Sequence, residues 1–401
     1  MLTMKILLLR DFNPFIENGA SANRFRGLIE GLRSIGHIVD VAVVGGIVNA
    51  KENSKSTQSV IYLSKSNRYS YWKARLNKYI FSGFHKWVAR MRFNRINLSE
   101  YDYIWLSNSS IVFNVFYGSK KTASCRTFIE LNEFNDIHKM KGHTGNFLQR
   151  IYGADSEQSF IDVVAKIDYF ACMTQTLLAH YKTMAKPNAQ FMHLPMTVDL
   201  KRFQSVEATD FYSKPYIAYT GTFNNAKDGV DILIRSFAKI ASKYPQHHLY
   251  LAGFWHYDVP SQEKLIKYFE LTNRITYLGV LNKDQIPSFI GNAELLVLSR
   301  PDSHQAQGGF PTKLGEYLAT GNPVCVTKVG EIPDYLEDNV SAFMATPGDV
   351  DSFADAMDRA LGNPEKARKV GLTGLEVAKK EFNSEIQAKR LADFLKQNLK
   401  K

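Results

Sequence analysis

The feature that most constrains this chain is an alternation of strand-like and helix-like segments that occurs twice. Near the N-terminus an apolar run, Lys5–Leu9, precedes residues 25–35, whose apolar positions follow helical spacing, and then a second run, Ile38–Val44. The order restarts with the run Tyr216–Thr220 and a helical segment, Ile232–Ala241. Strands separated by helices form parallel sheets with helices on their faces, so two successive α/β domains are predicted.

A polar stretch, residues 199–214, separates the two patterns and is predicted to be the linker. We expect residues 1–204 to form a first Rossmann-like domain and residues 205–380 a second one. The stretch Asp349–Lys401 is helical by pattern, and residues 381–401 are treated as a separate C-terminal helix. The predicted fold class is therefore α/β, with two Rossmann-like domains whose parallel sheets face a central cleft.

Composition excludes several classes of protein. The chain has 401 residues, 45% of them hydrophobic and 22% charged, which excludes a disordered tail, a collagen-like fibre and a polytopic membrane protein. No apolar stretch is long enough to span a bilayer, and no signal peptide is expected. The three cysteines, Cys125, Cys172 and Cys325, show no metal-ligand spacing and are expected to be buried and reduced. A cytoplasmic protein is expected.

The net charge is +11, and much of the excess lies in one stretch. Residues 65–96 contain nine Lys or Arg and no Asp or Glu, interleaved with aromatic residues such as Tyr69, Trp72 and Trp87. Basic side chains with aromatic neighbours are typical of elements on anionic membrane surfaces. A helical insertion with its aromatic residues in the core and its charges in water would have the same composition, so both interpretations stay open. No nucleic-acid-binding motif accompanies the stretch.

Two segments of the second pattern are candidates for an anion site. Gly308–Lys313 contains two glycines and then Pro311, which is predicted to lie in the first turn of a helix. The free N–H groups of that turn would face an anion, and Lys313 adds a charge. Glu316, one turn further on, could accept hydrogen bonds from sugar hydroxyls. Gly221–Gly229 follows a strand and precedes a helix, where open α/β sheets bind ligands, and Lys227 could neutralise a phosphate. Ordinary surface turns remain the alternative.

Two segments of the first pattern are further candidates. Gly19 and Ala20 are small residues at the start of a helix, where a ligand could approach. Glu130–Glu133 lies at the end of a strand and contains Asn132 between two carboxylates. These side chains could bind hydroxyls or a cation, or form turn hydrogen bonds.

At these residues the chain resembles the retaining glycosyltransferases of family GT4, which have the two-domain GT-B fold. The segment from Gly309 through Val324 is similar to the family's C-terminal motif, with Glu316 at the position that binds the donor ribose. Gly221–Gly229 resembles the family's glycine–arginine–lysine motif, with Lys227 at the position of the lysine that holds the diphosphate. Gly19–Ala20 resembles its N-terminal Gly-Gly loop. The resemblance implies donor binding by Gly308, Gly309, Phe310, Pro311, Thr312, Lys313 and the other residues named here.

Three positions depart from the family pattern. Gly308 stands where the family has a Glu that contacts the donor sugar, and Thr222 stands where it has an Arg. Asn132 and Glu133 stand where it has His-Asp or His-Glu near the donor sugar, and they are the candidate catalytic residues with Lys227. The candidates that would replace the missing charge are Asn224, Arg300 and Lys313.

The resemblance implies transfer of a sugar from a nucleotide diphosphate to a glycan or lipid-linked acceptor, with retention of configuration. It implies a bacterial surface polysaccharide as product, and a C-terminal helix that crosses back to the first domain. No Asp-x-Asp motif occurs in a suitable loop, so no metal and no other cofactor is expected, and the donor is a UDP- or GDP-sugar. A binding-only relative, which is favoured by the three departures, and a GT-B sugar-nucleotide epimerase stay as alternatives.

Overall fold

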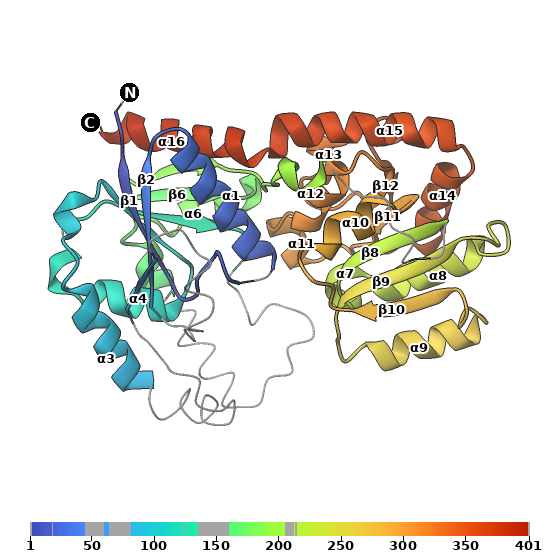
Figure 1. Ribbon diagram of the computed structural model, residues 1–401, viewed down its shortest axis with the longest axis horizontal. Helices are drawn as coiled ribbons and strands as arrows, with labels where there is room; N and C mark the ends of the chain where they lie inside the picture. Colours follow the sequence, from blue (N-terminus) through green and yellow to red (C-terminus); the bar gives the residue numbers. More distant parts are fainter. Residues whose placement is uncertain are drawn as a thin grey trace. The chain divides into compact units, whose positions relative to one another are not determined.

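The computed structural model describes residues 2–17, 19–44, 60–63, 82–122, 124–134, 160–204, 212 and 215–399. These residues divide into two compact units (Figure 1). The first unit comprises the described residues up to 134, residues 160–194 and residues 387–399, and the second comprises residues 195–386. The first unit is therefore discontinuous in sequence, because its last segment follows the whole of the second unit.

The first unit is built on a seven-stranded sheet in the order β3-β2-β1-β4-β5-β6-β7. Each neighbouring pair is parallel, as expected when helical segments connect the strands. The strands are β1 Lys5–Arg10, β2 Ile38–Val43, β3 Val60–Tyr62, β4 Tyr103–Leu106, β5 Thr127–Leu131, β6 Tyr169–Cys172 and β7 Gln190–His193. The helices are α1 Ala20–Ser34, α3 Ser82–Phe93, α4 Ser110–Tyr117, α6 Gln175–Lys182 and the 3₁₀ turns Leu98–Glu100 and Lys120–Thr122.

Helix α16, Ser384–Leu399, begins in the second unit and contributes most of its length to the core of the first. Figure 1 shows it running beside β1, β2 and α1. Its residues Leu391 and Leu395 belong to the same buried cluster as Leu8 and Trp105 of the sheet, and the Tyr103 hydroxyl donates to the Leu395 carbonyl at 2.7 Å. One face of the first sheet is thus covered by α1 together with α16.

The second unit contains a six-stranded parallel sheet in the order β10-β9-β8-β11-β12-β13. Its strands are β8 Tyr216–Thr222, β9 His248–Phe254, β10 Ile275–Gly279, β11 Leu295–Leu298, β12 Val324–Thr327 and β13 Phe343–Ala345. Its helices are α7 Asn225–Asp228, α8 Val230–Ile240, α9 Val259–Tyr268, α10 Gln285–Gly291, α11 His304–Gly308, α12 Thr312–Ala319, α13 Ile332–Tyr335, α14 Val350–Leu361 and α15 Pro364–Val377, with a π-helical turn, Ala378–Phe382.

The prediction of two Rossmann-like domains with parallel sheets is confirmed, and two local predictions are wrong. Strand β12 begins at Val324 and not at Pro323, because proline has no N–H to donate to a ladder. The predicted linker is partly ordered, since Leu200–Phe203 forms a 3₁₀ turn that is capped by the Asp199 carboxylate and belongs to the second unit.

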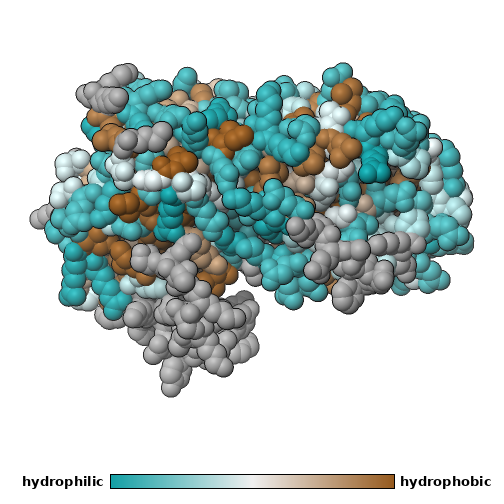
Figure 2. Space-filling view, turned by 45° about the horizontal axis from the view of Figure 1, so that its top comes forward, coloured by the Kyte–Doolittle hydropathy of each residue, from teal (hydrophilic) through white to brown (hydrophobic). Residues whose placement is uncertain are grey.

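The surface in Figure 2 is mainly hydrophilic, and its hydrophobic side chains form separate groups. No helix among the described residues is long and apolar enough to cross a membrane. Of the basic-aromatic stretch, residues 65–81 lie outside the described residues. The remainder, residues 82–96, contains the whole of α3, in which Phe93 is buried against Phe116 while Trp87 is 55% exposed. The buried Phe93 therefore agrees with a helical insertion that packs in the core, and the exposed Trp87 agrees with a membrane-surface element.

Candidate functional site

The candidate site lies at the carboxyl edge of the second sheet, where β8 lies between β9 and β11. From β8 the chain proceeds outward to β9 and β10, and then returns to the other side of β8 to form β11. In open α/β sheets such a reversal leaves room for a ligand beyond the carboxyl ends of the two central strands. The segments after β8 and β11 are those in which the sequence predicts an anion site.

The loop after β8 is held by a helix cap and a glycine. The Asn224 side chain caps α7 by accepting a hydrogen bond from the Lys227 N–H at 2.9 Å. Gly229 ends α7 in the left-handed conformation at φ 67°, and a Cβ there would lie 2.1 Å from the Ser299 carbonyl oxygen. The loop therefore closes against the end of β11 and leaves the Lys227 side chain exposed.

Asp228, which the sequence analysis does not select, is the buried centre of this edge. It is 4% exposed, accepts a hydrogen bond from the Tyr219 hydroxyl at 3.0 Å, and forms an ion pair with Lys313 at 3.0 Å. Burial by itself raises the pKa of this carboxyl, but nearby cations lower it by more, so the pKa of Asp228 lies below its usual value. These cations are Lys313, Arg300 and Lys227.

The structure therefore brings together three predicted donor-binding cations around one carboxylate. Lys313 contacts this group most directly, because its Nζ forms the ion pair with Asp228 and also lies 4.8 Å from the centre of the Tyr219 ring. Burial lowers the pKa of its ammonium group, and the Asp228 charge opposes that shift. Gly221, near the end of β8, has a positive φ of 154°, and a Cβ there would displace the Lys313 Nζ, which would lie 2.3 Å away. Lys313 is thus positioned by the protein itself.

The loop after β9 adds aromatic residues that the sequence analysis does not select. It is attached to the loop after β8 by a hydrogen bond from the Phe223 N–H to the Phe254 carbonyl at 3.0 Å. A second link joins the Asn224 amide to the His256 ring at 3.0 Å. Trp255 is 62% exposed in this loop, and Thr222, the last residue of β8, pairs in register with Phe254. An apolar surface therefore borders the cationic one.

The segment from Gly308 to Thr312 is more regular than the sequence suggests. Gly308 is the last residue of α11, Gly309 is extended, and neither has a positive φ. Pro311 is the N-cap of α12, one residue before the position predicted for it, and Thr312 begins the helix. The Phe310 ring packs against Tyr335 and Phe382 at 5.6 and 5.3 Å. This ring is part of the core, so any donor contact from Phe310 would come from its backbone.

Glu316, on α12, forms an ion pair with Arg202 at 2.8 Å. Arg202 lies in the 3₁₀ turn that replaces part of the predicted linker, which explains why it was not a candidate from sequence. Both side chains are largely buried, with 20% and 17% exposed. The carboxylate predicted to bind ribose is therefore already oriented by an arginine.

The candidate residues of the first unit lie at the carboxyl edge of the other sheet. Gly19, at φ 126°, is the N-cap of α1, and Ala20 is the first residue of that helix. Asn132 follows β5 directly and is half-buried, whereas Glu133 is exposed. Glu130, inside β5, forms a buried ion pair with Arg24 of α1. This pair ties the N-terminal turn of the helix to the strand that precedes Asn132.

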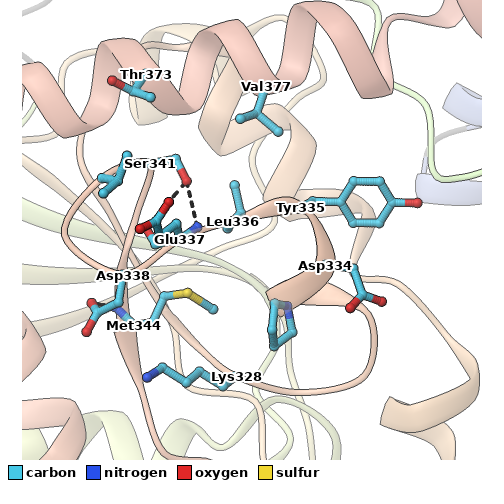
Figure 3. A pocket seen from close by; sticks show the side chains of 12 residues that line it. Lys328, Asp334, Tyr335, Leu336, Glu337, Asp338, Ser341, Met344, Thr373 and Val377 are labelled. Carbon is cyan, nitrogen blue, oxygen red and sulfur yellow. Dashed lines mark hydrogen bonds between the residues drawn. The ribbon is translucent and has the colours of Figure 1, made fainter.

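A hollow of about 630 Å³ lies elsewhere in the second unit (Figure 3). Side chains of α13, of the segment after it and of α15 line it, among them Tyr335, Glu337 and Thr373. The Ser341 hydroxyl beside it accepts a hydrogen bond from the Glu337 N–H at 2.9 Å. None of the predicted site residues lines this hollow. The described residues also contain no group of His, Cys, Asp or Glu placed to hold a metal ion.

Comparison with known proteins shows that the second unit is similar to one family of enzymes. Residues 214–363 match the family described as glycosyl transferases group 1. The chain is 22% identical over 254 residues to a GDP-mannose-dependent monoacylated alpha-(1-6)-phosphatidylinositol monomannoside mannosyltransferase of Corynebacterium glutamicum, covering 60% of this chain and 65% of that one. It is 28% identical over 129 residues to the amylovoran biosynthesis glycosyltransferase AmsK of Erwinia amylovora, covering 31% of each. The chain thus spans less than two thirds of the length of either relative.

Solved structures support the same architecture. The chain matches sucrose-phosphate synthase of Thermosynechococcus elongatus with a TM-score of 0.73 and 17% identity, covering 98% of both chains. It matches Anabaena HepE, solved in complex with UDP and glucose, with a TM-score of 0.71 and 16% identity, covering 98% of this chain and 100% of HepE. These likenesses confirm the fold class, and with the family match they confirm the resemblance to the GT-B glycosyltransferases.

Proposed function

We propose that this chain, whose second unit matches the group 1 glycosyl transferases, transfers a sugar from a nucleoside diphosphate to a hydroxyl group of a glycan or lipid-linked glycan, with retention of configuration. The donor is a UDP- or GDP-sugar, and the product belongs to a bacterial surface polysaccharide such as capsule, O-antigen or exopolysaccharide. The observation that carries this proposal is the gathering of Lys227, Arg300 and Lys313 around Asp228 at the reversal point of the second sheet.

The chemistry needs positive groups at this edge because negative charge develops on the diphosphate as the glycosidic bond breaks. Lys227 is exposed there, and the first-turn amides of α12, at Thr312 and Lys313, have no partner within the helix. The acceptor hydroxyl forms the new bond on the face that the diphosphate leaves, and its proton passes to the departing diphosphate. No metal takes part in these steps, so an excess of EDTA should leave turnover unchanged.

Relatives support a nucleotide sugar as donor without deciding its base. The mannosyltransferase of Corynebacterium glutamicum is named as GDP-mannose-dependent, and HepE was solved with UDP and glucose. AmsK is named for the biosynthesis of amylovoran. These names favour a glycan as the acceptor of this chain and leave both nucleotides to be tested.

The proposal includes peripheral binding to the cytoplasmic face of an anionic membrane, where lipid-linked acceptors are found. Helix α3 supports it, since Trp87 and Met91 are 55% and 42% exposed on a helix with basic residues in its last turn. Flotation with vesicles of phosphatidylglycerol and phosphatidylcholine should recover the protein at low salt and lose it at high salt. Equal recovery with purely zwitterionic vesicles would argue against an electrostatic contact.

Thermal unfolding in the presence of UDP, GDP and their sugars tests the central proposal. A ligand that binds only the folded state raises Tm, and at 100 times its Kd it stabilises by about 2.7 kcal/mol. We expect one nucleotide family to raise Tm and the other to do so weakly. If neither UDP nor GDP raises Tm, the proposed function is wrong.

One alternative is favoured by specific residues. Gly308, Thr222 and Asn132 replace polar or charged residues of the family pattern, so a relative that binds nucleotide without transferring sugar is the second candidate. It predicts the same rise in Tm, but neither transfer nor hydrolysis of the donor. Release of free nucleotide from the stabilising donor in a coupled assay separates the two.

A further inference from the structure

At the carboxyl edge of three neighbouring strands, the first unit contains buried polar atoms that lack a hydrogen-bond partner among the residues that the structure describes. They are the Nε and Nη1 atoms of Arg10, the Oγ of Ser107, the Oε2 of Glu130 and the Oδ1 of Asn132. Arg10, Ser107 and Glu130 are only 4%, 5% and 3% exposed. Buried polar groups are nearly always satisfied, so such a concentration calls for an explanation.

The register of the sheet places these side chains on one face. Leu9 of β1 pairs with Leu106 of β4, which pairs with Ile129 of β5, so the three strands end at nearly the same level. Leu8, Trp105 and Phe128 belong to one buried cluster, and Arg10, Ser107 and Glu130 each follow one of them by two residues. Successive side chains of a strand alternate between faces, so all of these side chains lie on the face covered by α1.

The side chains around these polar atoms are fixed by aromatic stacking and by an ion pair. Trp105 stacks between Phe25 and Phe128, with ring centroids 5.0 Å apart in both cases. The Arg10 guanidinium lies 4.2 Å from the centre of the Phe25 ring and donates to Glu17 at 2.8 Å. These contacts fix the positions of the polar atoms, so a ligand would meet groups that are already oriented.

Charge and hydrogen-bonding capacity together indicate the class of ligand. Arg10 is paired with Glu17, and Glu130 with Arg24, so the charges of this cluster balance and do not favour an anion. The unpartnered atoms include donors on Arg10, acceptors on Glu130 and Asn132, and a hydroxyl on Ser107 that does both. A sugar ring offers several hydroxyls that each donate and accept, and it is neutral.

From this match we propose that Arg10, Ser107, Glu130 and Asn132 form a binding site for the hydroxyl groups of a neutral sugar ring. The inference rests on the proposed function, which supplies two such rings: the sugar to be transferred and the acceptor. Of these four residues, the resemblance to the family points to Asn132 alone. Arg10, Ser107 and Glu130 are new candidates.

The test uses two serine variants in the same unit. Ser119 is as buried as Ser107, at 6% exposed, but its hydroxyl donates to the Asn94 side chain at 2.6 Å. Ser119→Ala should therefore lower Tm and leave the KM values unchanged. Ser107→Ala should leave Tm unchanged or raise it, because no hydrogen bond within the protein is lost, and should raise one KM by roughly 3- to 10-fold. Arg10→Lys should raise the same KM by roughly 10- to 100-fold.

The KM values show whether the site holds the transferred sugar or the acceptor. They also distinguish failure of the sugar site from failure of the proposed function. If the site holds the transferred sugar, the variants raise the KM for the donor, including in its hydrolysis without acceptor. If it holds the acceptor, only the KM for the acceptor rises. UDP or GDP alone should raise Tm by the same amount in Ser107→Ala and in wild type. If neither nucleotide raises the Tm of wild type, the proposed function is refuted, and not the sugar site. Wild-type KM values for both substrates in Ser107→Ala and in Arg10→Lys would overturn the sugar site.

Discussion

The carboxyl edges of the two sheets differ in how many of their buried polar atoms are hydrogen-bonded within the described part of the protein. In the second unit the charged side chains of the edge bond to one another: Asp228 to Lys313, and Glu316 to Arg202. In the first unit Arg10 also pairs with Glu17, but its Nε and Nη1 atoms and the Ser107 hydroxyl have no hydrogen-bond partner among the described residues. Both edges belong to parallel sheets of the same class, so the difference lies in the side chains and not in the fold.

Under the proposed function, this difference corresponds to two tasks of a group-transfer enzyme. A leaving diphosphate is stabilised best by charges that are already fixed before the reaction, since their reorganisation would add to the barrier. A sugar is recognised by hydrogen bonds that the protein leaves open, because a group already bonded within the protein has to break that bond to bind a ligand. The second unit therefore fits the stabilisation of the diphosphate, and the first unit fits the recognition of a sugar.

The largest expected effect comes from Asp228→Asn, which leaves the Lys313 ammonium buried without its carboxylate. Removing one partner of a buried pair typically costs ~3–5 kcal/mol, so urea unfolding at neutral pH should show a loss of this size. The double variant Asp228→Asn/Lys313→Met should recover much of it. If Asp228→Asn is as stable as wild type, this edge is not held by its ion pair.

Lys227→Ala should affect turnover and not stability, since Lys227 is exposed beside the paired groups. Loss of one group that stabilises the leaving diphosphate is expected to lower kcat by ~100- to 1000-fold. Lys239→Ala is the matched control, because Lys239 is a half-exposed lysine paired with Asp351 on the same unit. Near-wild-type kcat in Lys227→Ala would assign the cationic edge another role.

Acid should weaken the second unit through Asp228. The pKa of this carboxyl is lower in the folded protein than its usual value of 3.8, because nearby cations outweigh the effect of burial. The folded state then binds fewer protons than the unfolded one, so the group stabilises the fold above that value and loses this contribution as the pH falls through the folded pKa. The free energy of unfolding should therefore fall less in Asp228→Asn/Lys313→Met than in wild type between about pH 5 and pH 2. Parallel curves would contradict the assigned shift.

The smallest expected effect is that of Glu316→Gln. Glutamine can keep one hydrogen bond to Arg202 in this largely buried pair, so the change should cost only about 1 kcal/mol of stability. If Glu316 binds the ribose, the Kd for the nucleotide should rise by roughly 3- to 10-fold, measured by calorimetry. An unchanged Kd would limit this carboxylate to orienting Arg202.

The sequence could predict the parts of this molecule that depend on neighbouring residues. The alternation of strands and helices, the loop that carries Lys227 and the helix that begins at Thr312 all follow from local pattern and were found with errors of one or two residues. Proline chemistry explains the misplaced start of β12, since Pro323 ends the turn before the strand and does not join the ladder.

The parts it could not predict depend on which strands become neighbours. Asp228 looks like an ordinary loop carboxylate until α12 brings Lys313 beside it, 85 positions later in the chain. Arg10 and Ser107 come together only because β1 lies next to β4 in the sheet. Phe310 matches the family motif, but its ring packs in the core, so a motif match did not separate a core residue from a contact residue.

Helix α16 has a consequence for the order in which the chain can fold. Its residues Leu391 and Leu395 complete the hydrophobic core of the first unit, yet the ribosome makes them only after all of the second unit. During synthesis the part of the first core that α16 covers must therefore stay uncovered until residues 387–399 emerge, whereas α1 is already present and the second unit can be completed earlier. The N-terminal unit is thus the last to complete its core, and a nascent chain arrested before residue 387 should bind chaperones through its N-terminal half.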